Sequence, residues 1–219
     1  MYRITITYPT TEGARFDWTY YMNNHLPLAV GTSMRHSGLN FCDADRPINT
    51  SSPHAAVCMV HFDSKKSMRD FCDFFVNGHP DSETIGADEI NYTTIKPGMT
   101  TAECDSNDGP LLAPCRIKIF FPMSDSAESS RQAISEAQSA ILGGNESVSW
   151  TESDYCLSGL AEGSAPDYSL IWTLNFDDRE AALAFDADLS VLEDLCHSRA
   201  QLMVSEVMTF DLSLTAAYR

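Results

Sequence analysis

The sequence has few basic residues, and this shortage limits the partners that the protein can attract by charge. Lys and Arg together number 14 among 219 residues, against 31 Asp and Glu, which gives a formal net charge of −17. A surface with this excess of carboxylates repels the phosphates of nucleic acids and the headgroups of anionic bilayers. We therefore expect neither nucleic acid nor a membrane as a partner.

Long apolar runs and an export signal are also missing. The chain begins Met1-Tyr-Arg-Ile-Thr-Ile-Thr-Tyr, without the basic and then apolar regions of a secretory leader. No apolar run approaches the roughly 20 residues that a membrane-spanning helix needs. These absences predict a soluble, cytoplasmic protein.

Paired cysteines and the common cofactor motifs are absent as well. The cysteines are scattered without a CxxC pair, which is typical of reduced thiols in a core and not of a zinc cluster or a disulfide framework. The sequence contains no GxGxxG motif, no P-loop and no spacing typical of metal ligands. We expect no metal and no other cofactor.

An internal repeat is the strongest organising signal that is present. Ile4-Thr-Ile-Thr-Tyr-Pro9 resembles Ile117-Lys-Ile-Phe-Phe-Pro122, and in both segments apolar residues alternate until a proline ends the strand. Nearly the same separation along the chain relates the Phe-Asp pair that begins at Phe62 to a second pair that begins at Phe176. Two pairs of similar segments, separated by nearly the same number of residues, indicate two copies of one structural unit.

Each copy is predicted to have the order βαββαβ. In the first copy the expected strands cover residues 2–8, 39–43, 55–63 and 90–96, and the expected helices cover 18–32 and 65–76. In the second copy the expected strands cover 117–121, 150–157, 169–176 and 204–212, and the expected helices lie near 133–141 and 181–196. Asp63 and Asp177, where a strand turns into a helix, are predicted N-caps.

The two copies are predicted to be two modules joined by a linker. Residues 99–114 are rich in small and polar residues without periodicity, which is typical of a linker, so the expected modules are 1–98 and 115–219. A four-stranded sheet with helices on one face leaves its other face bare, and a second copy can cover it. The predicted fold class is α+β: two tandem ferredoxin-like modules that form a dimeric α+β barrel within one chain.

A proline interrupts the first predicted helix. Pro27 has no N–H to give to the preceding turn, and it disfavours helical dihedrals at Leu26. We therefore expect the helix to kink or end there, with His25 at a distorted turn.

The same helix carries a candidate proton-transfer group. Tyr21 and His25 are four residues apart and share one face, and Trp18 extends the same stripe. A histidine that points into an apolar cavity beside a tyrosine hydroxyl can give or take a proton near neutral pH. A core histidine that is hydrogen-bonded to a backbone carbonyl would give the same local pattern.

The first half contains a set of short motifs: Tyr8-Pro9, Phe16-Asp17, Tyr20-Tyr21, His25-Leu-Pro-Leu28, Phe62-Asp63 and Asn91-Tyr-Thr93. Together these motifs resemble the signature of the EthD family, whose members form dimeric α+β barrels. The resemblance covers residues 1–98. The second half has Ala133, Ile134 and Gln138 where the first half has Tyr20, Tyr21 and His25. The second module is therefore expected to keep the fold without the signature.

The resemblance implies an enzyme that acts without a cofactor on a small apolar, carbonyl-bearing molecule, aromatic or polyketide-like. Dehydration, cyclisation or isomerisation by proton transfer is the expected chemistry, which makes the protein similar to a lyase or an isomerase. His25 is the predicted acid and base, and Tyr21 is the predicted hydrogen-bond donor to developing oxyanion charge. The predicted substrate-binding residues are Phe16, Trp18, Met22, Met59, His61 and Tyr92.

Other interpretations of the same residues stay open. His61 and Asn175 are equivalent in the repeat and are expected to point into the barrel interior, where a satisfied polar pair would suffice to explain them. The protein could be a carrier that binds a small apolar ligand without changing it, or a cofactor-free monooxygenase. A third alternative is heme binding, with His25 or His61 as the axial ligand. Pairing of two chains as a homodimer is also left open.

Overall fold

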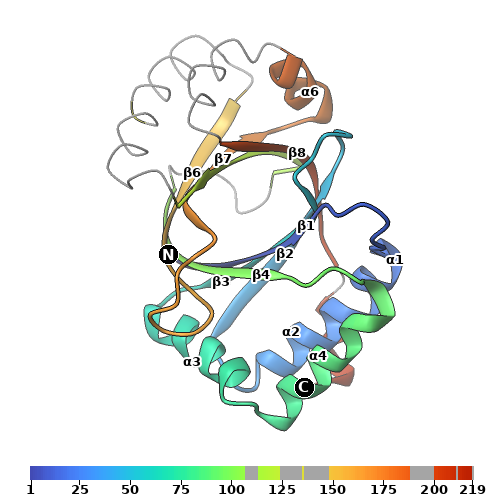
Figure 1. The fold of residues 1–219 in the computed structure, drawn as a ribbon, viewed down its shortest axis with the longest axis vertical. Coiled ribbons are helices and arrows are strands. Elements are labelled where there is room, and N and C mark those ends of the chain that lie inside the picture. The colour runs from blue at the N-terminus through green and yellow to red at the C-terminus, as the bar shows by residue number, and fades with distance from the viewer. Residues whose placement is uncertain (107–112, 124–134, 136–147, 188–199, 211, 219) are drawn as a thin grey trace.

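The computed structural model describes residues 1–106, 113–123, 135, 148–187, 200–210 and 212–218. In this part of the chain eight antiparallel strands form a closed barrel, with helices on its outside (Figure 1). The strands are β1 Tyr2–Pro9, β2 Leu39–Pro47, β3 His54–Phe62, β4 Gly98–Ser106, β5 Cys115–Pro122, β6 Val148–Gly159, β7 Tyr168–Phe176 and β8 Gln201–Met208. The architecture is that of an α+β barrel.

Each half of the chain contributes four neighbouring strands to the barrel. Their order around it is β4-β1-β3-β2 and then β8-β5-β7-β6, and the halves meet where β2 pairs with β8 and β4 pairs with β6. At the second junction Thr101 lies opposite Ser158, and the Thr101 hydroxyl donates to the Ser158 carbonyl at 3.0 Å. The two halves are therefore joined by continuous backbone pairing.

The helices lie on opposite sides of the barrel. They are α1 Trp18–Tyr20, a π-helical turn η1 Tyr21–His25, α2 Leu26–Ser33, α3 Lys65–Val76, α4 Pro80–Tyr92, α6 Arg179–Ala187 and a 3₁₀ helix η2 Leu212–Ala217. Helices α2, α3 and α4 lie below the barrel in Figure 1, α1 lies at its right, and α6 lies above it. Among the described residues, no helix combines the length and the apolarity that a membrane crossing requires.

Strand alternation separates an outer apolar surface from a polar interior. On β1, Ile4 and Tyr8 join the apolar cluster beneath the helices of the first half, and on β5 Ile117 joins the corresponding cluster of the second half. The side chains of Arg3 and Arg116 occur at alternate positions and are fully buried inside the barrel. The core therefore has two apolar layers outside the barrel, and the interior between them holds buried ion pairs together with a small apolar cluster.

Two predictions at the end of the first half are wrong. Residues 90–96 were expected to form a strand, but helix α4 continues to Tyr92. Strand β4 covers residues 98–106, and all but the first of these lie in the predicted linker. The helix begins at Pro80 with the His79 side chain accepting from the backbone N–H of Asp81, which is a strong start signal. Strand β4 is polar in sequence, and its backbone is satisfied by β1 on one side and β6 on the other.

The chain does not leave the helical conformation at Pro27, but the prediction that His25 lies at a distorted turn is confirmed. Leu26 has helical dihedrals, φ −61° and ψ −45°, and the chain runs on into α2 with Pro27 in its first turn. The distortion falls one turn earlier, because residues 21–25 form a π-helical turn in which the N–H of Leu26 bonds to the carbonyl of Tyr21. His25 lies in that turn, and such turns often occur at functional sites.

The helix caps and the remaining boundaries differ in detail. Ser64, and not Asp63, accepts the free N–H of Ser67 at the start of α3. Asp178, one residue after the predicted cap, accepts from Ala181. Strand β8 ends at residue 208 and not at 212. The expected helix at 133–141 lies outside the described residues except for residue 135, and so does the end of the one expected at 181–196.

Candidate functional site

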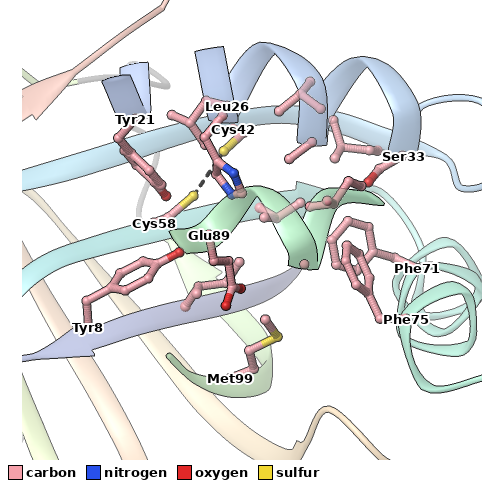
Figure 2. A pocket seen from close by; sticks show the side chains of 18 residues that line it. Tyr8, Tyr21, Leu26, Ser33, Cys42, Cys58, Phe71, Phe75, Glu89 and Met99 are labelled. Carbon is pink, nitrogen blue, oxygen red and sulfur yellow. Dashed lines mark hydrogen bonds between the residues drawn. The ribbon is translucent and has the colours of Figure 1, made fainter. Parts of the chain in front are cut away.

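An apolar cavity lies between the outer face of the first-half sheet and its helices (Figure 2). Its volume is about 600 Å³, including the space open to solvent. Strands β1 to β4 provide one wall, and α2, α3 and α4 provide the other. The lining includes Ile6, Val30, Phe71 and Phe75, and such a cavity suits a small apolar molecule.

Four side chains form a hydrogen-bonded relay at the cavity wall. Nδ1 of His25 lies 3.0 Å from Oδ2 of Asp88, and Nε2 lies 3.3 Å from the hydroxyl of Tyr92. The Tyr92 hydroxyl in turn lies 2.9 Å from that of Tyr8. A carboxylate only accepts, so Asp88 holds the proton on Nδ1 and leaves Nε2 as the basic nitrogen. His25 and Tyr8 line the cavity, whereas Asp88 and Tyr92 do not, so the relay reaches the interior of the cavity at its second and its last member.

The environment favours the neutral, basic form of His25. Burial lowers the pKa of His25, and this effect outweighs the Asp88 carboxylate, which acts in the opposite direction. Burial of Asp88 disfavours its ionised form, but hydrogen bonds from Asn91, Tyr20 and His25 hold its pKa below the usual value. At neutral pH the pair is therefore an ionised carboxylate that orients a neutral imidazole.

Burial favours the protonated forms of other titratable groups at or beside the cavity. Burial raises the pKa of the Tyr8, Tyr21 and Tyr92 hydroxyls, so they can donate hydrogen bonds at any physiological pH. Burial also raises the pKa of Glu89, which follows Asp88 on α4 and lines the cavity near Met99 (Figure 2). The cavity thus combines one base with several neutral proton donors.

The structure brings most of the predicted site residues of the first helix together. The Tyr21 ring lines the cavity and stacks on His25, with centroids 5.5 Å apart and planes 18° apart. Phe16 and Trp18 contact Tyr21 at centroid distances of 5.0 and 5.9 Å. Tyr92, which was expected on a strand, lies at the end of α4, and its ring centroid is 4.4 Å from that of His25. Met22 is buried in the adjacent core cluster. Like Phe16, Trp18 and Tyr92, it does not line the cavity.

Met59 and His61 lie on the opposite face of β3, inside the barrel. Met59 belongs to the small apolar cluster of the barrel interior, so the expected place in the cavity wall is wrong for it. Nε2 of His61 bonds to Asp43 at 3.0 Å, and the ring stacks on Phe41. The prediction that His61 and Asn175 point into the interior is confirmed, because Asn175 there accepts from Nε of Arg116 at 3.1 Å.

The barrel interior contains buried ion pairs that join the two halves. Arg3 on β1 contacts Asp154 at 2.9 Å and Glu152 at 3.0 Å, both on β6. Arg116 on β5 contacts Asp43 at 2.6 Å on β2. Further contacts in this cluster are Arg116 to Asp45 at 3.5 Å and Lys118 to Asp45 at 2.8 Å. Each arginine thus binds acids of the other half, which gives this network a structural role.

Sequence reasoning missed Asp88, Tyr8 and Glu89 as members of the site. Asp88 and Glu89 fell in a segment without a predicted helix, although the start signal at His79-Pro80 could have revealed α4. Tyr8 belongs to the Tyr8-Pro9 motif, from which the sequence predicts only the end of a strand. No local pattern indicates that its hydroxyl meets that of Tyr92, because the two residues are 84 positions apart.

One group of possible metal ligands exists among the described residues, away from the cavity. Donor atoms of His36, His79 and Asp81 lie within 4.8 Å of one another. Asp81 is already bonded to His36 at 3.0 Å and to Arg35 at 3.1 Å. None of these residues lines the cavity, so the group has no part in its chemistry.

Comparisons with known proteins establish the fold. No protein-family model matches the chain, and no curated protein matches it in sequence. An anthrone oxidase-like protein of known structure is 10% identical and aligns over 95% of this chain and 91% of its own, with a TM-score of 0.62. A monooxygenase-like protein from Fusobacterium nucleatum is 7% identical over 95% of this chain and 92% of its own, with a TM-score of 0.52. An EthD-like protein from Ralstonia eutropha is 26% identical over 47% of this chain and 89% of its own, with a TM-score of 0.39. The chain therefore has the dimeric α+β barrel type of fold.

Proposed function

We propose that the protein is an enzyme that moves a proton on a small apolar, carbonyl-bearing substrate, aromatic or polyketide-like, and needs no cofactor to do so. The observation that carries the proposal is a carboxylate-oriented His25, which burial keeps in its neutral form, in the wall of an apolar cavity. Such a cavity desolvates a substrate carbonyl and strengthens every hydrogen bond to it.

The expected chemistry begins with His25 as the base. Nε2 takes a proton from a carbon beside the substrate carbonyl, either directly or through the hydroxyls of Tyr92 and Tyr8, and Asp88 stabilises the imidazolium that forms. The carbonyl oxygen gains negative charge, which the protonated hydroxyl of Tyr21 or Tyr8 can stabilise by donating a hydrogen bond. Return of the proton to another atom completes an isomerisation, and loss of a hydroxyl group completes a dehydration.

Glu89 is the second acid that this chemistry can use. Its carboxyl lines the same cavity, and burial raises its pKa, so a neutral fraction persists to higher pH than for an exposed glutamate. A neutral carboxylic acid can protonate a departing hydroxyl group while His25 acts as the base. We assign Glu89 this role for dehydration.

We further infer that the chain is a single-chain barrel of two ferredoxin-like modules related to the EthD family. Both halves have the strand order fourth, first, third, second, and the first half carries the signature residues. The first module extends to residue 106, because β4 completes its sheet, and the second covers residues 115–219. The counterparts of Tyr20, Tyr21 and His25 in the second module lie outside the described part of the chain.

Two other functions use the same cavity and differ in what happens to the ligand. A carrier would bind the ligand and release it unchanged. In a cofactor-free monooxygenase the same deprotonated substrate would react with O₂. We consider this function because the structural neighbours include a monooxygenase-like and an anthrone oxidase-like protein. All three functions require an apolar ligand at His25.

Anthrone, a tricyclic ketone with an acidic methylene group, separates these functions. In deuterated buffer without O₂, the enzyme should accelerate deuterium exchange at that methylene, measured by NMR, well above the buffer rate. Binding of anthrone without faster exchange would favour the carrier. Exchange together with O₂ consumption in aerated buffer would favour the monooxygenase.

A further inference from the structure

A second hollow lies directly outside the cavity, at the junction of the two halves. It encloses about 780 Å³, including the space open to solvent, and its wall includes Lys96, Pro97, Met99, Leu160 and Ala161. The first three belong to the segment that enters β4, and the last two follow β6 in the second half. The wall is mainly apolar, with the exposed ammonium group of Lys96 at its edge.

Two side chains separate this outer hollow from the inner cavity. Glu89 and Met99 line both of them, and Figure 2 shows the two side chains near one another on the side of the cavity that faces β4. Met99 is an unbranched, flexible side chain, and Glu89 is only half buried. A change of rotamer at either residue would join the two spaces.

The second half supplies its part of the hollow on a well-anchored turn. The backbone N–H of Gly159 donates to the carbonyl oxygen of Ser164 at 3.0 Å, and the backbone N–H of Ser164 donates to the carbonyl oxygen of Ala161 at 3.1 Å. Farther along, the N–H of Asp167 donates to the Thr100 hydroxyl on β4 at 3.2 Å. Leu160 packs against the apolar cluster of the first half. The turn therefore has a fixed position beside the cavity entrance.

We propose that the outer hollow is a second binding subsite, which holds an extended apolar side chain of a ligand whose ring system occupies the inner cavity. This inference rests on the proposed function and narrows its substrate class to ring compounds with a chain. The ring would lie at His25, the chain would pass between Glu89 and Met99, and its end would contact Leu160 and Ala161. The second half, which lacks the signature residues, would then determine specificity for the site of the first half.

The test compares two hydroxyanthraquinones, one with a methyl and one with an octyl side chain, by equilibrium dialysis. Each buried CH₂ strengthens binding by about fourfold. The wild type should therefore bind the octyl compound at least ~10-fold more tightly than the methyl compound, even if only about two methylenes are buried. Ala161→Trp fills the outer hollow and should reduce this ratio to about 1 without weakening the methyl compound.

Ala165→Trp is the matched control, because Ala165 is exposed on the same turn and does not line the hollow. This variant should keep the wild-type ratio. Equal binding of the two compounds by the wild type, or an unchanged ratio in Ala161→Trp, would overturn the outer subsite and leave the inner cavity intact. Failure of the wild type to bind the methyl compound at all would instead contradict the proposed function, and the subsite with it.

Discussion

Replacing Asp88 by asparagine tests whether the relay, and not the cavity alone, produces the proposed activity. The Asp88→Asn change keeps the size of the side chain but removes the charge that accepts the Nδ1 proton of His25 at 3.0 Å. A hydrogen bond to a charged group contributes about 1.5–3 kcal/mol. If most of this is lost in the transition state, the rate of anthrone exchange should fall by roughly 10- to 150-fold. An amide that donates to Nδ1 would also move the proton to Nε2 and remove the base.

The same variant should change the pH dependence in a defined direction. The Asp88 carboxylate acts to raise the pKa of His25, against the dominant lowering by burial. Its removal lowers the pKa of His25 further, so the acid limb of the exchange profile should move to lower pH. Asp81→Asn is the matched control, because Asp81 also lies on α4 and bonds a histidine at 3.0 Å, but outside the cavity. Equal rates and equal acid limbs for wild type, Asp88→Asn and Asp81→Asn would refute the role of the relay.

Three further predictions concern stability and are checked by chemical denaturation of the purified variants. Arg116→Met removes the cationic partner of the buried Asp43, which among the described residues keeps only the hydrogen bond to His61, and should cost about 3–5 kcal/mol. Loss of the exposed ion pair of Arg46 should cost at most about 1 kcal/mol, and equal costs would contradict the structural role of the interior network. Burial lowers the pKa of His54 from 6.5 to about 4, so the folded state binds this proton less tightly than the unfolded state. The contribution of His54 to the free energy of unfolding should be fully present above pH 6.5 and fall by about 3 kcal/mol towards pH 4, and His54→Gln should remove this part of the pH dependence. In α4, a Cβ added at Gly86 has no heavy atom within 4 Å, so Gly86→Ala should stabilise the fold by about 0.5–1 kcal/mol. A Cβ added at Gly31 lies 2.8 Å from the Thr215 carbonyl oxygen, so Gly31→Ala should destabilise the fold by about 1–3 kcal/mol, and the opposite order would refute the packing of η2 on α2.

The fold was predictable where the sequence pattern is local and periodic. Alternation predicted β1 and β5, and helical spacing predicted α3 with its observed bounds. Strand β4 was missed because its residues are polar and its stability comes from pairing with β1 and β6, which no local pattern reveals. The π-helical turn at residues 21–25 was missed because proline chemistry predicts a disruption but not the hydrogen-bond shift that absorbs it.

The candidate site was predictable only in part, for the same physical reason. His25 and Tyr21 share a helix, so their spacing alone placed them together. Asp88 reaches His25, and Tyr8 reaches Tyr92, from distant segments, so these contacts depend on how α4 and β1 pack. Alternation placed His61 in the barrel interior, but its partner Asp43 comes from a neighbouring strand whose register the sequence does not specify.

The exchange activity of His25→Gln tests the central claim most directly. Glutamine nearly preserves the size and polarity of the side chain but cannot take up a proton, so the variant should still bind the methyl hydroxyanthraquinone within about 3-fold of wild type, while anthrone exchange falls by roughly 100-fold or more. His36→Gln, which changes a histidine outside the cavity, should exchange anthrone at the wild-type rate. If His25→Gln binds the ligand and exchanges anthrone as fast as the wild type, His25 is not the base, and the cavity is a binding site only.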